Sequence, residues 1–473
     1  MIAGLKPYAE VKDSGVEWLG AVPAHWQIVP AFVAYRPHEI RNVGMVEKTV
    51  LSLSYGRIVV KPEEKLRGLV PESFETYQIV DPGNIIVRTT DLQNDRNSLR
   101  IGHAKNRGII TSAYMCLETT SQVENEFGYQ YLNAYDLLKI IYGYGSGLRQ
   151  NLDFKDIKRM PVLLPPKEEQ AAIVRFLDHA DRRIRRAIAA KQKLIQLLEE
   201  QKQVIIHRAV TRGLDPDVRL KHSGVEWLGD VPEHWVVSKI RHFAHIGNGS
   251  TPSRGRVDYW KDGSFPWLNS SVANQKVVSD SDQFVTAVAL RECHLPVLEP
   301  GCVLVAITGQ GKTRGKAALL AFDATINQHL AYISVHKKQV LPAFVQLALT
   351  AGYKALRSIS NDSGSTKGAL TCADLRHFKV PLPAIPEQHE IVRFMDSETA
   401  SIEPAIERAG DEIDLLREYR TRLIADVVTG KLDVREAAAR LPDSPEPELA
   451  DEALDTEDGD ASLDEVIAED EAA

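Results

Sequence analysis

Hydrophobic and polar residues along the chain follow two different periods. From Pro165 to about Arg208, apolar residues recur at alternating steps of four and three, and few helix-breaking residues intervene. This spacing predicts one long helix with a coiled-coil seam. The seam positions expected to pack against a partner helix are Ile173, Leu177, Ile184, Leu194, Leu198 and Ile205.

A second stretch repeats this seam 218 residues later. Its expected packing positions are Ile391, Met395, Ile402, Leu416 and Leu423. Two such seams in one chain predict two helices that face each other. Pro404 falls inside the second stretch, where the first has Arg186. Because an interior proline removes a backbone donor and clashes with the preceding turn, we predict a kink or a restart near Ser401.

The segments between these helices have the shorter period of β-structure. Residues 84–90, 108–118 and 302–308 are apolar runs bounded by Gly, Asn and Asp, which is typical of strands. Short helices are expected around 129–141 and 342–359. Each segment therefore predicts a mixed α/β domain of about 130 residues, a common domain size.

The chain also contains an internal repeat. SGVEWLGAVPAHW begins at Ser14 and SGVEWLGDVPEHW at Ser223, with 11 of 13 positions identical. EEQAAIVRFLD from Glu168 matches PEQHEIVRFMD from Pro386, while the sequences between these anchors diverge. A duplicated frame around unlike inserts predicts a pseudo-dimer about an approximate two-fold axis. An array of unrelated domains with similar linkers is the alternative.

Charge changes the picture only when it is divided along the chain. The 473 residues, enough for two to four domains, include 57 Lys+Arg and 65 Asp+Glu, a net charge of -8 that taken alone argues against a nucleic-acid partner. Fourteen of the acidic residues lie between Asp443 and Glu471, and no Lys or Arg follows Arg440. The rest of the chain is mildly basic at +6, which permits phosphate contact. The tail is expected to be disordered, either as an inert solubilising extension or as a DNA mimic.

Cysteine spacing and hydropathy indicate the compartment. Cys116, Cys293, Cys302 and Cys372 lie far apart, without the spacing of a zinc site or a disulfide framework. The N-terminal residues MIAGLKPYAEVKDSG lack the apolar core of a signal peptide, and no apolar run reaches the roughly 18 residues that a membrane span needs. We expect a cytoplasmic protein with reduced thiols and no membrane partner.

Motifs for catalysis are nearly absent. Glu63 and Lys65 form a bare Glu-x-Lys, a nuclease spacing, without the acidic partner that would support it. AITGQGKT, from Ala306 to Thr313, fits a relaxed phosphate-loop pattern. The segment that follows has the glycine-interrupted pattern of a hairpin rather than the helix that a phosphate loop needs. A nucleotide-binding enzyme that uses this loop remains an alternative function.

The same loop favours contact with DNA. Lys312, Arg314 and Lys316 alternate, and alternate side chains on a hairpin share one face. Other cationic and amide residues gather at the start of the second insert and in the matching stretch of the first, and Arg and Asn fit guanine and adenine edges. The complete set of expected DNA contacts is Arg88, Arg96, Arg100, Lys105, Arg107, Arg149, Asn248, Thr251, Arg254, Arg256, Asn269, Lys312, Arg314, Lys316 and Lys367.

The duplicated motifs resemble one known family. The doubled SGVEWLG-VP-HW, the doubled EEQ or PEQ followed by IVRF, and the helix ends TRGLD and TGKLD are similar to the specificity subunit of type I restriction-modification systems. GNGSTPSR from Gly247, FPWLNS from Phe265 and TINQH from Thr325 add to the resemblance. It runs from about Ser14 to Asp433 and departs at Pro404 and at the C-terminal extension.

This resemblance implies a mixed α/β architecture in five parts. Two target-recognition domains would occupy 14–160 and 223–380, and two conserved spacer helices would occupy 161–213 and 381–430 as an antiparallel coiled coil with a pseudo-two-fold internal repeat. The acidic tail, 441–473, would follow. A helix of about 43 residues is roughly 65 Å long, less than two turns of B-DNA, so a short fixed gap between two half-sites is expected.

The resemblance also implies the partners. Double-stranded DNA would be bound as an asymmetric split sequence, one half by each recognition domain. Two methyltransferase subunits and two motor-nuclease subunits would dock on the chain. S-adenosylmethionine, ATP and Mg²⁺ would belong to those partners, so no catalytic, cofactor-binding or metal-binding residue is expected here. A coiled-coil scaffold without DNA contact is the second alternative.

Overall fold

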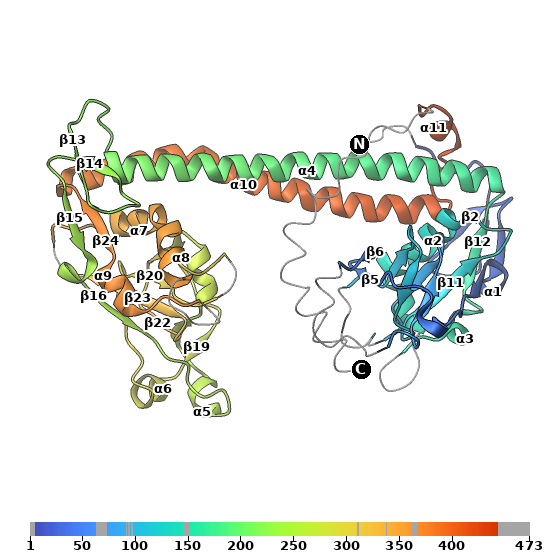
Figure 1. Ribbon diagram of the computed structural model, residues 1–473, viewed down its shortest axis with the longest axis horizontal. Coiled ribbons are helices and arrows are strands. Elements are labelled where there is room, and N and C mark those ends of the chain that lie inside the picture. The colour runs from blue at the N-terminus through green and yellow to red at the C-terminus, as the bar shows by residue number, and fades with distance from the viewer. Residues whose placement is uncertain are drawn as a thin grey trace. The chain divides into compact units, whose positions relative to one another are not determined.

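The computed structural model divides the chain into two compact units. Unit 1 comprises Met1–Gln192 with Asp411–Ala473, and unit 2 comprises Lys193–Gly410. Each unit therefore takes part of the long helices α4 (Lys167–Arg212) and α10 (Ile385–Val428) together with one α/β domain (Figure 1). The residues that the structure describes are 5–62, 73–90, 92, 95, 98–144, 151–309, 312–336, 338–361 and 368–442. The mixed α/β class is as expected from the sequence.

Unit 1 is built on a four-stranded antiparallel sheet. Its strand order is β4 (Tyr35–Pro37), β11 (Met115–Thr119), β8 (Ile85–Val87) and β9 (Ile101–His103). Helix α2 (Asn125–Leu137) contacts β9 and β11. The remaining strands pair two by two, as β1 (Val11–Asp13) with β2 (Ala21–Pro23), β3 (Gln27–Pro30) with β12 (Pro161–Leu164), β5 (Leu51–Ser54) with β6 (Arg57–Val60), and β7 (Gln78–Val80) with β10 (Gly108–Ile110). Short helices are α1 (Ala31–Ala34), α3 (Phe154–Ile157), α11 (Arg435–Ala439) and the 3-10 turns Val43–Met45 and Ile140–Tyr144.

Unit 2 contains a larger sheet. The five strands run in the order β16 (Ala244–Asn248), β23 (Leu330–Val335), β20 (Val303–Ala306), β21 (Ala317–Leu320) and β18 (Val277–Val278). A second sheet has the order β19 (Phe284–Val285), β17 (Phe265–Leu268) and β22 (Thr325–Ile326). The two-stranded pairs are β13 (Leu220–His222) with β14 (Asp230–Pro232) and β15 (Val236–Lys239) with β24 (Lys379–Leu382). The helices are α5 (Val257–Trp260), α6 (Ala287–Glu292), α7 (Pro342–Ala351), α8 (Tyr353–Asn361), α9 (Cys372–His377) and the 3-10 turns Ile240–His242 and Ser270–Asn274.

The predicted short elements are present with shifted boundaries. Residues 84–90 and 302–308 contain β8 and β20, and residues 108–118 divide into β10 and β11. The helix expected over 342–359 is interrupted at Gly352 and forms α7 and α8. A Cβ at Gly352 would lie 2.7 Å from the Phe378 ring, so the close packing of this ring requires glycine at the break.

The duplicated tryptophan motif has the same role in both units. Trp26 and Trp235 are fully buried. The indole N–H of Trp26 donates to Glu169 Oε2 at 2.7 Å, and His25 Nε2 lies 2.6 Å from the other oxygen of that carboxylate. The indole of Trp235 donates to Glu387 in the same way, at 3.0 Å. Because a buried indole N–H needs an acceptor, the two repeated motifs are a linked structural pair.

The glutamine of each repeated motif fixes the start of one helix in each α/β domain. Gln170 accepts a hydrogen bond from the Glu124 amide at 2.8 Å, immediately before α2. Gln388 accepts one from the Leu341 amide at 2.8 Å, immediately before α7. Both glutamines are fully buried, and both donate only to main-chain carbonyls. The repeated glutamine therefore makes equivalent hydrogen bonds from α4 to the first insert and from α10 to the second.

Burial along α4 corrects part of the predicted seam. Ile173, Leu177 and Ile184 are buried as expected. Ile188 is buried next, one residue later than a strict coiled-coil repeat requires, and Leu194 is 45% exposed. The prediction that Leu194 packs in the seam is therefore wrong, because a straight helix has 3.6 residues per turn and drifts from a 3.5-residue repeat. The other predicted positions, Leu198 and Ile205, are half-buried.

Helix α10 agrees with its predicted seam and does not restart at Pro404. Its buried or half-buried seam positions are Ile391, Met395, Ile402, Leu416 and Leu423. Helical backbone continues from Ile385 to Val428 through Pro404. The restart predicted near Ser401 is therefore wrong, and the kink stays a prediction.

Ion pairs between the two helices give their direction within unit 1. Asp181 of α4 pairs with Arg420 of α10, and Lys191 pairs with Glu412. Rising numbers on α4 meet falling numbers on α10, so the helices are antiparallel here, as predicted. These partly exposed pairs are expected to contribute about 1 kcal/mol or less each, and they help to set the register of the two helices.

Candidate nucleic-acid interface

Strand topology brings several loops of unit 2 to one edge of its sheet. Strands β16 and β20 both pair antiparallel with β23 and therefore run in the same direction. Asn248, the exposed last residue of β16, lies opposite Ala331, and Ala306, the last residue of β20, lies opposite Leu330. The chain consequently leaves both strands beside the start of β23.

The smaller sheet delivers two more loops to the same edge. Strands β17 and β22 are parallel, with Leu268 opposite Ile326, so both end together. The turn after β22 leads directly into β23. We call this surface the loop edge of unit 2. It consists of residues 249–256, 269–275, 307–309, 312–316 and 327–329.

A chain of hydrogen bonds joins three loops of the loop edge. The Thr251 hydroxyl donates to Gln328 Oε1. Gln328 Nε2 lies 3.1 Å from His329 Nε2, and His329 Nδ1 lies 2.7 Å from Thr308 Oγ1. Asn327 fixes the turn, because its Oδ1 accepts from the His329 amide at 3.0 Å. We call Thr251, Gln328, His329 and Thr308 the three-loop network. Sequence reasoning singled out Thr251 but did not predict a role for Gln328 or His329.

Close backbone approach holds the first of these loops in place. The Ser250 amide donates to the Ile326 carbonyl at 3.1 Å, and Trp267 Nε1 donates to the Ser250 carbonyl at 3.2 Å. A Cβ on Gly249 would lie 1.7 Å from the Ile326 carbonyl oxygen. Only glycine fits there, so the loop is positioned before any ligand binds.

The hairpin between β20 and β21 supplies lysines to the edge. Lys312 is exposed, and Lys316 is half-exposed with Nζ 3.0 Å from Asn274 Oδ1. Asn269 is engaged locally, since its Oδ1 accepts from the Ser271 amide at 2.9 Å. The two lysines therefore add positive charge to the loop edge.

The prediction that Arg314 contacts DNA is wrong. Its side chain is only 4% exposed and donates to the Gly368 carbonyl and, at 2.6 Å, to Asn361 Oδ1. Burial lowers the pKa of its guanidinium. Arg314 holds the hairpin against the end of α8 and cannot touch DNA in this conformation, contrary to our expectation.

Two arginines in the loop after β16 differ in how far their positive charge is available to bind DNA. The Arg254 guanidinium lies 3.8 Å from the centroid of the Trp260 ring and donates to Gln283 at 2.8 Å. Arg256 makes two hydrogen bonds to Asp258, and a hydrogen bond from Arg256 is the main cause that lowers the pKa of this carboxylate. Stacking on an indole orients a cation without neutralising it, whereas a paired carboxylate does neutralise it. Arg254 is thus the better DNA contact.

Unit 1 has a corresponding edge with fewer described residues. Strand β8 ends beside the start of β11, with Val87 opposite Met115, and the same edge receives the end of β4. Arg88 follows β8 directly and lies 3.4 Å from Asp95. This is the place equivalent to the β20–β21 hairpin of unit 2.

The prediction for Arg100 is also corrected by its burial. Its side chain is fully buried. The guanidinium donates to the carbonyls of Thr90 and Asp95, both at 2.6 Å, and to the Tyr142 hydroxyl at 3.0 Å. Arg100 stabilises the residues that follow β8 through these buried hydrogen bonds. The predicted contact of Arg100 with DNA is therefore wrong.

Other predicted contacts lie away from this edge. Lys105 and Arg107 follow β9 and lie near the start of β8, at the opposite end of the strands. Arg107 pairs with Asp81 and, at 3.5 Å, with Glu47. Lys105 is exposed. Neither is brought together with Arg88.

Several predicted features fall outside the described residues. These are the candidate DNA contacts Arg96, Arg149 and Lys367, the Glu63 and Lys65 pair, and the acidic tail from Asp443 onward.

The phosphate-loop alternative loses its structural basis. Strand β20 is followed by β21 in an antiparallel hairpin, with Val305 opposite Ala317, rather than by a helix. A phosphate loop places its anion at a helix N-terminus, which is missing at this position. Among the described residues, no group of three or more His, Cys, Asp or Glu side chains could hold a metal ion.

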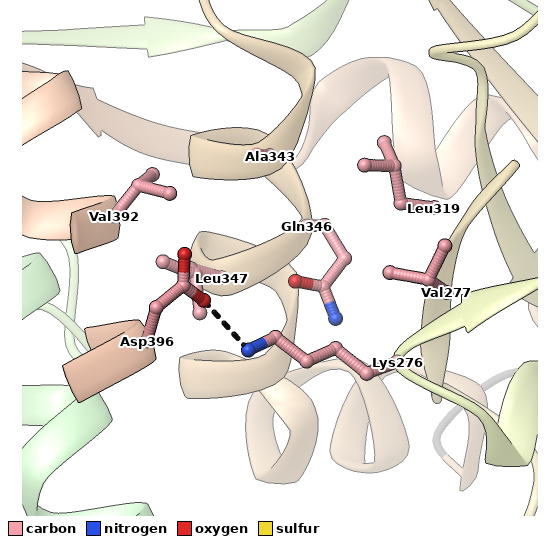
Figure 2. A pocket seen from close by; sticks show the side chains of 8 residues that line it. All are labelled: Lys276, Val277, Leu319, Ala343, Gln346, Leu347, Val392 and Asp396. Atoms are coloured by element: carbon pink, nitrogen blue, oxygen red, sulfur yellow. Dashed lines mark hydrogen bonds and ion pairs between the residues drawn. The ribbon is translucent and has the colours of Figure 1, made fainter. Parts of the chain in front are cut away.

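A small pocket in unit 2 does not define a second ligand site. It lies beside α7 and α10, where Lys276 Nζ is 2.8 Å from Asp396 Oδ1 (Figure 2). Leu347 and Val392 line its apolar part. Its cavity volume of about 130 Å³ is below the roughly 300 Å³ of a typical ligand site. The ion pair instead ties the start of β18 to α10.

Hydropathy of the helices adds one finding. None of the helices in the described part of the chain is both long and apolar enough to span a bilayer.

The fold and the loop edges together define the class: an internally duplicated α/β protein with unlike loops on a common frame. The model of the family described as type I restriction modification DNA specificity domain matches residues 47–199 and 232–408. These segments cover more than half of the chain, which therefore belongs to this family. The resemblance inferred from the motifs is confirmed.

Relatives and solved structures agree with this assignment. The chain is 24% identical over 279 residues to the EcoR124I/EcoR124II specificity subunit of Escherichia coli, covering 57% of this chain and 62% of the relative. It is 24% identical over 291 residues to the putative MjaX specificity subunit of Methanocaldococcus jannaschii, covering 61% and 63%. The aligned part thus spans less than two thirds of these relatives.

One solved chain has the same fold. It comes from work on complex assembly and conformational transition of the type I R-M system, and it superposes with a TM-score of 0.62 at 16% identity. The match covers 87% of this chain and 99% of that chain.

Proposed function

We propose that the chain is the DNA-recognition subunit of a type I restriction-modification complex and that each unit binds one half of a split sequence in double-stranded DNA. The observation that carries the proposal is the loop edge of unit 2, where four strand ends deliver amide, hydroxyl and cationic side chains to one surface. The equivalent edge of unit 1 carries different residues on the same frame. Unlike loops on equivalent edges support an asymmetric DNA site.

The catalytic steps would belong to partner subunits. We expect two methyltransferase subunits, which bring S-adenosylmethionine, and two motor-nuclease subunits, which bring ATP and Mg²⁺. This expectation rests on the family to which the chain belongs. A coiled-coil scaffold without DNA contact is the competing function, and it differs by showing no salt-dependent affinity for DNA.

Mapping modified bases tests the proposal directly. Co-expression of the chain with its methyltransferase subunit should place methyl groups within one split motif across the host genome. Omitting the chain should abolish that modification. Methylation that persists without the chain, or that occurs outside a single split motif, would overturn the proposed function.

Arg254 and Arg256 form a matched pair for a second prediction. Replacing Arg254 with alanine should weaken binding of the reconstituted complex to its own site by about 1–3 kcal/mol, because an oriented, unneutralised cation is lost. Replacing Arg256 with alanine should change the dissociation constant less than about twofold, because its charge is already paired with a carboxylate. Fluorescence anisotropy at one fixed salt concentration measures both. A larger loss for Arg256→Ala would contradict the assignment.

A further inference from the structure

We infer that the three-loop network, Thr251, Gln328, His329 and Thr308, binds a phosphate of the DNA backbone and does not read a base. This inference rests on the proposed function and refines it. It assigns to the second recognition unit a fixed anchor that sets where the DNA lies, leaving base recognition to other side chains of the loop edge.

Hydrogen-bond directions in the network follow from its chemistry. An amide nitrogen can only donate, so His329 Nε2 must accept from Gln328 Nε2 at 3.1 Å. The proton of the neutral ring is then on Nδ1, which donates to Thr308 Oγ1 at 2.7 Å. With the Thr251 hydroxyl donating to Gln328 Oε1, every bond in the network runs the same way.

The common direction of these hydrogen bonds determines which hydrogens of the network remain free to donate to a ligand. Two hydrogens have no acceptor within the network, namely the second amide hydrogen of Gln328 and the hydroxyl hydrogen of Thr308. Gln328 is exposed and Thr308 is half-exposed. Two donors without a formal charge, one on each side of the His329 ring, suit the oxygens of a phosphate, and Lys316 of the loop edge adds a favourable potential.

A role in reading bases is less consistent with this geometry. A glutamine that reads adenine uses its oxygen and its nitrogen together and must be free to face the base edge. Here the amide of Gln328 is held at both ends, by Thr251 and by His329. Turning it toward a base would break both hydrogen bonds. The backbone contacts of Gly249 and Ser250 also fix the loop, which suits a contact that is the same for every DNA sequence.

The test compares two substitutions of Gln328 in the reconstituted complex. Gln328→Met keeps the length of the side chain but removes the donor, and it should lower affinity about 3- to 10-fold for specific and for unrelated duplexes alike. Gln328→Glu places a carboxylate beside the phosphate and should lower affinity further, with part of the loss recovered as salt rises because screening weakens the repulsion. The methylated motif should be unchanged in both variants.

Controls separate the possible results. Gln201→Glu, at an exposed position of α4, adds the same charge away from the loop edge and should leave affinity unchanged. Loss confined to the specific duplex, or a motif relaxed at one base pair, would show base reading and overturn the inference. Unchanged affinity in both Gln328 variants would also overturn it. Failure of the unmodified complex to bind DNA would instead remove the proposed function, and thermal melting of each variant checks that it is folded.

Discussion

Replacing Arg100 with methionine is expected to lower the free energy of unfolding of unit 1 by about 3–5 kcal/mol. The buried guanidinium donates to Thr90, Asp95 and Tyr142, and methionine would leave those acceptors without partners. Burial raises the pKa of Asp136, and the charge of Arg100 acts against that rise. Removing the cation therefore also leaves a buried carboxyl group less compensated.

Chemical denaturation followed by tryptophan fluorescence measures this loss. Trp18 contacts Tyr135 edge-on at 4.6 Å and reports on unit 1. Arg107→Met is the matched control, because its side chain is 55% exposed and its ion pairs are solvated, so a change below about 1 kcal/mol is expected. If both variants lost the same free energy of unfolding, the buried hydrogen bonds of Arg100 would not have the stabilising role that we assign to them.

Replacing Gly249 with valine is expected to abolish recognition by unit 2 with only a moderate loss of stability. The first side-chain carbon would overlap the Ile326 carbonyl oxygen, which is backbone and cannot rotate away. The loop must move, so Thr251 loses its position beside Gln328, and Arg254 in the same loop is displaced with it. The first change removes the phosphate contact and the second removes the candidate DNA contact. Overpacking of this kind costs about 1–3 kcal/mol, and we expect affinity for the specific duplex to fall at least tenfold.

Gly255→Val provides the control in the same loop. A Cβ on Gly255 would have only the Ser253 hydroxyl within 4 Å, at 3.8 Å, so the substitution should leave affinity within about twofold. Methylome mapping of the Gly249→Val complex should show the second half-site lost or relaxed. Retention of the complete motif would mean that the position of this loop does not control recognition.

The frame of this protein was predictable because its signals are local or repeated. The long helices follow from apolar spacing, and the doubled tryptophan and glutamate motifs identify the duplication. The details of packing were less accessible. Leu194 was assigned to the seam from a strict heptad, whereas the helix follows its own 3.6-residue period and buries Ile188 instead.

Candidate contacts were harder to predict, since burial depends on partners distant in the chain. Arg100 looks like an exposed loop residue, but Asp136 and Tyr142, 36 and 42 residues away, enclose it. The three-loop network could not be found from the sequence either. Gln328 and Thr251 are 77 residues apart, and only the pairing of β16 and β20 with β23 brings their loops to one edge.

The buried glutamines of the frame have a consequence for how new specificities can arise. Gln170 and Gln388 grip the inserts only through main-chain atoms, which every amino acid possesses. These hydrogen bonds therefore place no demand on the side chains of the inserts, whereas the apolar core of unit 2, which includes Ile391 and Met395 of α10, does. An insert exchanged between genes by recombination would keep these hydrogen bonds whatever its sequence, provided that its apolar residues still pack against α4 and α10.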